Sequence, residues 1–300
     1  MSAGICRAGT SFWLHIRAAS GGCVLKARVL TALGLLPLAL LILFVLPETA
    51  FALCVAGIVM MGAWEWVRLS GLVSRHVRWP LLVGFAALLG LAYELPMQFV
   101  PTVLGVGCVF WALAAFLVMM YPRSRERVGG RRMKLIFGLL VLIPAYVALL
   151  YLRRHDAHVL LIALLVAIIW AADVGAYFVG RRFGNSKLAP EVSPGKSWAG
   201  LIGGVCVALV IGLTAAFIGE PSDSLFSVTA WGWLIVIVAV TVLFSVLGDL
   251  FESLMKREHG VKDSSSLLPG HGGVMDRIDS LTAATPVFAL MIYLTNWPLA

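Results

Sequence analysis

The residues best suited to chemistry in this chain lie in one short polar segment, residues 249–280. This segment holds six carboxylates, four Lys or Arg, two His and four Gly between two long apolar runs. Charge close to hydrocarbon is costly, so helix packing alone does not explain such a composition. Carboxylates, amines and flexible glycines together suit the binding of a hard cation and of phosphate groups, and they indicate metal-assisted phosphate chemistry.

Two aspartates of this segment are expected at neighbouring helix ends. Asp249 closes the apolar run 228–250, and Val274 begins the next helical pattern, which carries Asp276. Two carboxylates without thiolate ligands suit a hard cation such as Mg²⁺. We interpret Asp249 and Asp276 as metal ligands; the alternative is a pair of solvated acids at helix ends.

Further polar residues accompany this pair. If the helix continues past Asp249, Ser253 and Lys256 lie on the same face. A Pro-Gly-His-Gly-Gly turn at 269–273 allows the backbone to approach phosphate closely. His271 is expected to contact the turn or a phosphate rather than a metal, and Asp279 is expected to orient Arg277. The candidate catalytic residues are Asp249, Lys256, Lys262, Asp263, Asp276 and Arg277, and the candidate substrate-binding residues here are Ser253, His271, Gly272, Gly273 and Asp279.

An upstream apolar run, 157–180, contains one buried acid, Asp173. A carboxylate at the centre of a membrane helix costs roughly 2.5–3.5 kcal/mol on insertion scales. Tyr177 lies one turn further on the same face, and the small residues Gly175 and Gly180 would let another helix approach. We interpret Asp173 and Tyr177 as cation or substrate contacts inside a cavity; the alternative is an aspartate hydrogen-bonded between helices.

The segment 193–197, Ser-Pro-Gly-Lys-Ser, superficially resembles a phosphate-binding P-loop. The P-loop motif requires a glycine at position 190, where this chain has Pro190, and no preceding strand is expected. A nucleoside-triphosphatase fold is therefore excluded. Pro194 in a first helical turn would still leave Lys196, Ser197 and free backbone N–H groups to meet an anion. The alternative is an ordinary helix cap beside a lysine that reaches the membrane surface.

Composition identifies the class of protein. Of the 300 residues, 61% are hydrophobic and 13% are charged, whereas soluble domains have about 45–50% apolar and about 25% charged residues. A membrane helix needs about 20 apolar residues. The sequence therefore predicts an all-α, polytopic integral membrane protein of about nine transmembrane helices, at 29–46, 51–67, 79–94, 99–121, 133–152, 157–180, 198–219, 228–250 and 280–297.

The distribution of Lys and Arg predicts the orientation. Basic residues concentrate in the N-terminal tail and after the second, fourth, sixth and eighth runs, and Arg153-Arg154 is the exception. Cytoplasmic connections carry this excess, so we expect a cytoplasmic N-terminus and a cytoplasmic site formed by 181–197 and 251–279. The net charge of +8 reflects this bias and favours anionic lipid headgroups. Without a basic folded domain, no nucleic-acid partner is expected.

The polar segment closely resembles the C-terminal signature of the phosphatidate cytidylyltransferase (CDP-diacylglycerol synthase) family. The matching residues are Ser253, Lys256-Arg257, Lys262-Asp263, His271-Gly272-Gly273, Asp276-Arg277 and Asp279. Blocks around Asp173, at 188–197 and at 25–32 are also similar to this family. The resemblance covers about residues 25–298. We divide the chain into a variable extension (1–24), N-terminal transmembrane helices (25–155) and a C-terminal catalytic transmembrane region (156–300).

The resemblance implies an enzyme of the bacterial inner membrane that converts CTP and phosphatidate into CDP-diacylglycerol and pyrophosphate. It implies Mg²⁺ on Asp249 and Asp276, with K⁺ as a second cation. The expected partners are CTP, phosphatidate and membrane lipids, with a second copy of the chain as a further candidate. Two other readings stay open: a transporter, which also uses intramembrane carboxylates, and another CTP-using lipid enzyme, such as a lipid kinase.

Overall fold

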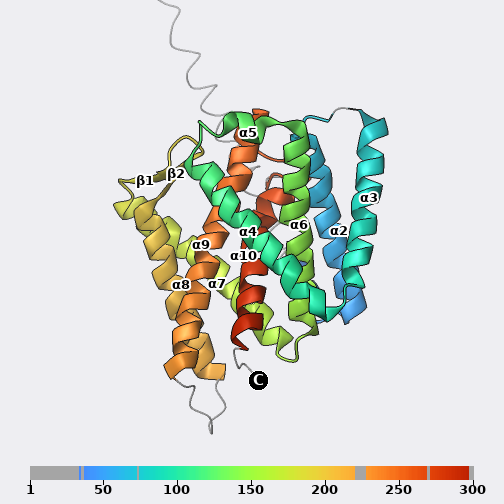
Figure 1. The fold of residues 1–300 in the computed structure, drawn as a ribbon. Helices are drawn as coiled ribbons and strands as arrows, with labels where there is room; N and C mark the ends of the chain where they lie inside the picture. Colours follow the sequence, from blue (N-terminus) through green and yellow to red (C-terminus); the bar gives the residue numbers. More distant parts are fainter. Residues whose placement is uncertain (1–33, 35–36, 73, 220–227, 269–270, 297–300) are drawn as a thin grey trace, which may run out of the picture.

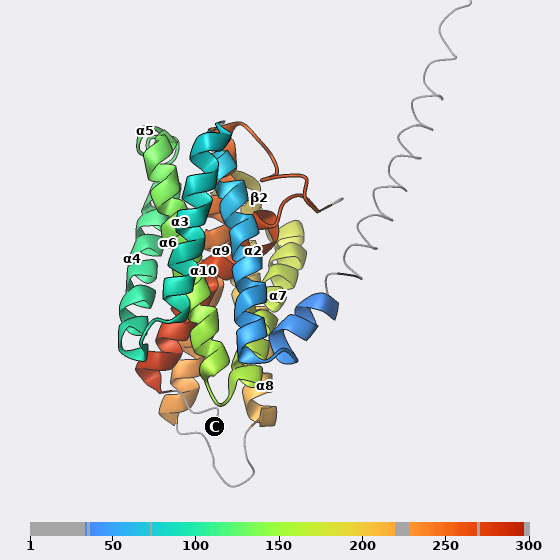
Figure 2. The same cartoon turned by 90° about the vertical axis from the view of Figure 1, so that its right-hand side faces the viewer.

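The computed structural model describes residues 34, 37–72, 74–219, 228–268 and 271–296. Within these ranges the chain is a bundle of helices (Figures 1 and 2), eight of which are long and apolar enough to cross a membrane. These are α2 (Glu48–Leu69), α3 (Arg75–Tyr93), α4 (Val100–Met119, after the 3₁₀ turn η1, Met97–Phe99), α6 (Arg131–Arg154), α7 (His158–Phe183), α8 (Trp198–Gly219), α9 (Val228–His259) and α10 (Met275–Thr295). A polytopic, all-α membrane protein is therefore confirmed.

Three shorter elements complete the described chain: helix α5 (Arg125–Gly129) and the strands β1 (Lys187–Ala189) and β2 (Ser193–Ser197). The first part of the predicted span 29–46 lies outside the described residues, and residues 37–44 of that span are helical. The extension 1–24 also lies outside them. The run 228–250 continues as helix to His259, which gives Ser253 and Lys256 the helical positions expected for them.

Helix α10 lies inside the bundle and contacts α2, α4, α6, α7 and α9 (Figure 1). Its middle is a run of buried small or polar residues, including Thr282, Ala283 and Ala284. The closest crossing is with α9 at Gly248, where an added Cβ would meet the carbonyl oxygen of Asp279. A glycine at 248 thus lets the two helices touch, and it places the next residue, Asp249, beside the first turns of α10.

Helices α7 and α8 also pack backbone against backbone. A Cβ on Gly175 would lie 2.7 Å from the carbonyl oxygen of Gly203, and one on Gly204 would lie 2.8 Å from that of Ala172. The close helix approach predicted at Gly175 is confirmed, with α8 as the neighbour. This packing fixes α7, and with it Asp173, against the rest of the C-terminal half.

The predicted helix entry at Ser193-Pro194 is wrong. Residues 193–197 form strand β2, which pairs antiparallel with β1 and matches Ala189 with Ser193. A proline donates no N–H and disfavours helical geometry in the residue before it, which suits an extended segment. Helix α8 begins at Trp198 instead, and the backbone N–H of Gly200 donates to the Ser197 hydroxyl at 3.2 Å.

The basic connections gather at one end of the bundle, the end that carries α5 and the β1–β2 hairpin (top of Figure 1). Arg153 and Arg154 lie at the opposite end and have structural partners there. The Arg154 guanidinium is 2.7 Å from Glu48 and donates to the carbonyl of Tyr93, while Arg153 donates to the carbonyl of Leu46. These two arginines therefore tie α6 to the ends of α2 and α3, which accounts for the exception in the charge pattern.

Candidate active site

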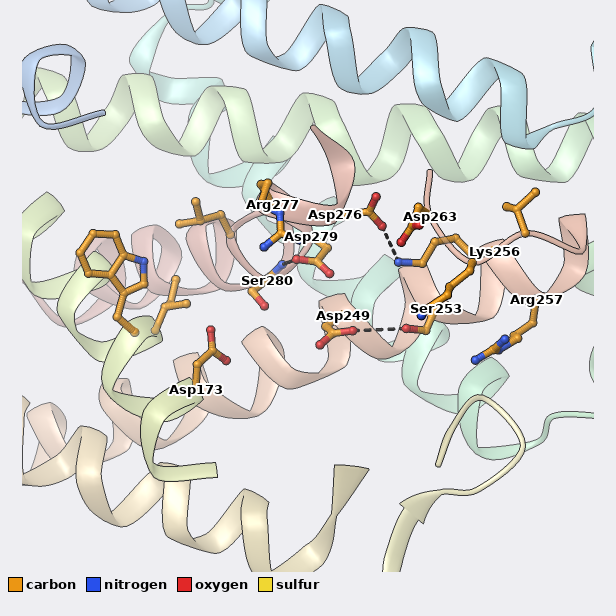
Figure 3. Close-up of a pocket in the computed structure, with 15 residues that line it drawn as sticks. Asp173, Asp249, Ser253, Lys256, Arg257, Asp263, Asp276, Arg277, Asp279 and Ser280 are labelled. Atoms are coloured by element: carbon orange, nitrogen blue, oxygen red, sulfur yellow. Dashed lines mark hydrogen bonds and ion pairs between the residues drawn. The ribbon is translucent and has the colours of Figure 1, made fainter. Parts of the chain in front are cut away.

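A cavity of about 650 Å³ opens at the basic end of the bundle, between α7, α9, the start of α10 and the loop that joins α9 to α10 (Figure 3). Its polar lining comes mainly from the segment singled out in the sequence. The lining residues are Ile169, Trp170, Asp173, Asp249, Ser253, Lys256, Arg257, Val261, Lys262, Asp263, Asp276, Arg277, Asp279, Ser280 and Leu281. The structure thus brings Asp173, Asp249 and Asp276 to one cavity from three helices.

Asp249 is held by one residue of its own helix and one of the hairpin. The Ser253 hydroxyl donates to Asp249 Oδ1 at 3.3 Å, one turn along α9. Lys196, from β2, places its Nζ 2.8 Å from Asp249 Oδ2 and 3.1 Å from the carbonyl oxygen of Val246. The β1–β2 hairpin therefore places the ammonium group of Lys196 against Asp249.

Asp276 belongs to a buried cluster of charges. Lys256 Nζ lies 2.6 Å from Asp276 Oδ1 and 2.5 Å from Glu252 Oε2. The side chains of Lys256, Asp276 and Glu252 are 13%, 8% and 2% exposed. One ammonium group therefore stands between two carboxylates where solvent screens little, which makes the attraction strong.

The other oxygen of Asp276, Oδ2, organises the loop before α10. It accepts hydrogen bonds from the backbone N–H groups of Ser264, at 3.0 Å, and Gly273, at 2.8 Å. Gly272 has φ +82°, and a Cβ there would lie only 2.7 Å from Asp276 Oδ2. Only glycine adopts this conformation without strain and leaves room for the carboxylate.

The remaining predicted site residues occupy several places. Lys262 and Asp263 line the cavity from the loop, and Asp279 lines it from α10, where its Oδ1 accepts from the N–H of Ser280 at 2.8 Å. Arg277 donates twice to the carbonyl of His271, at 3.1 and 2.8 Å. The structure therefore anchors Arg277 on the turn rather than on Asp279.

Other predicted residues do not line the cavity. Tyr177 is exposed, and its hydroxyl accepts from Arg181 at 3.1 Å. Ser197 is buried and caps α8. His271, Gly272 and Gly273 shape the turn behind Asp276. Lys196 is also absent from the cavity lining but contacts Asp249.

Sequence reasoning did not select three charged residues that lie in or beside the site. Arg257 lines the cavity and donates to the carbonyl of Val192 in the hairpin loop. Glu252 and Glu65 are buried carboxylates. Glu65 carried a usable signal, because it lies inside the apolar run 51–67, where the argument applied to Asp173 holds equally.

The donor set suits a nucleotide-bound Mg²⁺ better than a metal held by the protein alone. No group of three or more His, Cys, Asp or Glu that could hold a metal occurs among the described residues. Mg²⁺ commonly takes one or two carboxylates and completes its shell with water and substrate phosphates. Asp249 and Asp276 line one cavity with a lysine beside each, and they fit that mode.

Comparison with known proteins decides the family. A sequence model of the cytidylyltransferase family matches residues 26–295. The chain belongs to this family. It is 46% identical over 275 residues to the phosphatidate cytidylyltransferase of Pseudomonas aeruginosa, covering 91% of this chain and 99% of the relative. It is 42% identical to that of Haemophilus influenzae, covering 90% and 99%, and 34% identical to that of Brucella suis, covering 90% and 92%.

Membership of the cytidylyltransferase family agrees with the chemistry of the cavity. Five aspartates and four Lys or Arg line it, and a further lysine, Lys196, contacts Asp249. Such a mixture of charges can hold a nucleotide and a second phosphate group together. The matched region, 26–295, contains every residue of the cavity.

Proposed function

We propose that this chain is a phosphatidate cytidylyltransferase, which converts CTP and phosphatidate into CDP-diacylglycerol and pyrophosphate. The observation that carries the proposal is the match along nearly the whole chain to the enzymes of that name in Pseudomonas aeruginosa and Haemophilus influenzae. The cavity adds independent support, because its charged lining suits two phosphate-bearing substrates.

In the proposed reaction an oxygen of the lipid phosphate forms a bond to the α-phosphorus of CTP. The bond from that phosphorus to the bridging oxygen breaks, and its electrons leave with pyrophosphate. A phosphate monoester has a second pKa of about 6, so it is a nucleophile near neutral pH without a strong general base. The site therefore has to position two polyanions and offset their charge.

Asp249 and Asp276 are the proposed Mg²⁺ ligands, and K⁺ as a second cation is a proposal from the family alone. When bound, Mg²⁺ would act as a Lewis acid on the phosphate oxygens. Lys196 and Lys256 lie within 2.8 Å of the two carboxylates, so both amines would stand beside the phosphates of a nucleotide bound through those aspartates. Lys262 and Arg277 would offset the remaining charge.

The lining of the cavity supports a lipid substrate. Most of its polar residues lie on the α9–α10 loop and on the turns of α9 and α10 beside it, whereas the apolar residues Ile169 and Trp170 lie further from the basic end of α7 than Asp173. A phosphate headgroup at the polar end would leave the acyl chains beside the apolar end, in the bilayer. We propose that this end faces the cytoplasm, as does the N-terminus, in a bacterial inner membrane, and that the chain acts alone or as a homodimer.

Labelled CTP tests the reaction. Purified protein in detergent is supplied with Mg²⁺ and with CTP labelled at either the α- or the γ-phosphate, with and without phosphatidate. We expect organic-extractable label only from α-labelled CTP and only with phosphatidate. Label transferred from the γ-phosphate to a lipid acceptor would instead identify a lipid kinase, and no transfer at all would favour a transporter.

Arg125→Ala is expected to keep kcat/KM within about twofold of the wild type, because surface substitutions away from the active site usually change free energies by less than about 0.5 kcal/mol. The Arg125 side chain is 71% exposed, lies 3.5 Å from Glu258 and is absent from the cavity lining. Initial rates with labelled CTP check this. A loss of tenfold or more would extend the active site to α5.

A further inference from the structure

Glu65 is a fully buried carboxylate that reaches the catalytic segment from the other half of the chain. It lies on α2 with 0% of its surface exposed. Its hydrogen-bond partners are about 200 positions later in the sequence, in the loop before α10 and in the first residues of that helix. It is absent from the cavity lining, so any effect on the reaction must pass through that loop.

Each oxygen of Glu65 lies within hydrogen-bond distance of two donors. Oε1 accepts from the Ser265 hydroxyl at 2.5 Å and from the N–H of Val274 at 2.9 Å. Oε2 accepts from the N–H of Met275 at 2.7 Å and lies 2.9 Å from the Ser264 hydroxyl. The first N–H groups of a helix have no partner within it, and the helix dipole favours an anion there. Glu65 therefore caps α10 from another helix, because Val274, at the capping position, has no side-chain acceptor.

The same loop is held from its other side by Asp276. The Ser264 hydroxyl lies 2.9 Å from Glu65 Oε2 and 2.9 Å from Asp276 Oδ2, and it can donate its one proton to only one of them at a time. Gly273 lies between the same groups. A Cβ there would clash with the Ser264 hydroxyl and lie 2.6 Å from both oxygens of Glu65. Glu65 and Asp276 thus hold the loop from two sides, and no space remains for a side chain at position 273.

We propose that Glu65 is the positioning residue that sets Asp276 and the Gly272-Gly273 turn for cation and phosphate binding. The expected effect on cation binding and turnover rests on the proposed function, whereas the hydrogen bonds of Glu65 do not depend on it. Through its contacts with Ser264 and the start of α10, Glu65 fixes the position of the Asp276 carboxylate. It thereby also fixes which N–H and O–H groups donate to Asp276. Glutamine would be a poor substitute, because its amide NH₂ would replace one carboxylate oxygen and face two of the four donors.

The test uses the full-length protein and three variants: Glu65→Gln, Glu65→Asp and the control Glu258→Gln. Glu258 has a buried carboxylate (4% exposed) at the same end of the bundle, where it accepts from Tyr121, and it does not line the cavity. The readouts are the melting temperature, amide hydrogen exchange by mass spectrometry without substrate, and the Mg²⁺ dependence of kcat and KM.

We expect Glu65→Gln to speed exchange selectively in 264–276, with α6 unchanged. The Mg²⁺ concentration for half-maximal activity should rise about 10–100-fold, as is typical when a residue that orients a metal ligand is lost. Glu65→Asp should give an exchange rate and a Mg²⁺ requirement between those of Glu65→Gln and the wild type. Glu258→Gln should match the wild type in hydrogen exchange and in Mg²⁺ dependence.

Wild-type exchange in 264–276, or a lower melting temperature with unchanged Mg²⁺ dependence, would overturn the inference and leave Glu65 a purely structural residue. If Glu65→Gln does not fold, Glu65→Asp decides by the same criteria. If the wild type lacks CTP turnover but Glu65→Gln still releases 264–276, the proposed function fails while the role of Glu65 in holding the loop stands.

Discussion

Asp276→Asn is expected to lower kcat by about 10³-fold or more, while the protein still inserts and folds. A metal ion contributes several kcal/mol of charge stabilisation to the transition state, and about 4 kcal/mol corresponds to about 10³-fold in rate. Asparagine keeps the size of the side chain and one oxygen for the N–H groups of Ser264 and Gly273. It loses the charge that would hold the cation and that now pairs with Lys256.

The measurement is the initial rate of label transfer from α-labelled CTP at saturating phosphatidate, over a range of Mg²⁺ concentrations. Asp249→Asn should fall to a similar rate. Asp156→Asn is the matched control, because Asp156 is exposed in the connection between α6 and α7, at the far end of the bundle. Near-normal turnover in Asp276→Asn or Asp249→Asn would refute the metal assignment, and a collapsed melting temperature would attribute the loss to folding.

The part of the site that could be predicted is the part whose residues lie close to one another in the sequence, on the consecutive helices α9 and α10. Asp249 and Asp276 share a cavity because α9 and α10 are consecutive antiparallel helices, joined by residues 260–274. Their meeting follows from helix periodicity and the order of elements alone. The long membrane-spanning helices could also be predicted, because the length of an apolar run is enough to identify such a helix. The glycine at 248 adds a close crossing that a single sequence does not reveal.

The contacts that cross the bundle could not be predicted from spacing. Glu65 stands about 200 positions from its partners, and nothing in its neighbourhood specifies which helix end it caps. The hairpin at 187–197 was also missed, since its strands are short and a Ser-Pro pair suits a helix start as well as an extended segment. Lys196 was selected as an anion contact, yet its pairing with Asp249 depends on that hairpin.

Lys256→Met is expected to lower the free energy of unfolding by about 3–5 kcal/mol, the usual cost of removing one partner of a buried ion pair. Methionine matches the length of lysine but leaves the buried carboxylates of Glu252 and Asp276 without their shared cation. Glu252 Oε1 already lacks a hydrogen-bond partner among the described residues, so the loss of Lys256 would remove the ion pair that offsets the burial of this carboxylate. Denaturant titration in detergent measures the loss.

The double variant Lys256→Met/Glu252→Gln separates stability from catalysis. Replacing the buried carboxylate by a neutral amide should recover much of the lost stability, because an uncompensated charge costs more than a neutral polar group. Turnover should stay low, since Asp276 still lacks its amine. Lys262→Met is the control, because Lys262 is exposed on the same cavity and should alter activity but not stability. A Lys256→Met protein as stable as the wild type would show that the Glu252–Lys256–Asp276 cluster does not hold α9 against α10.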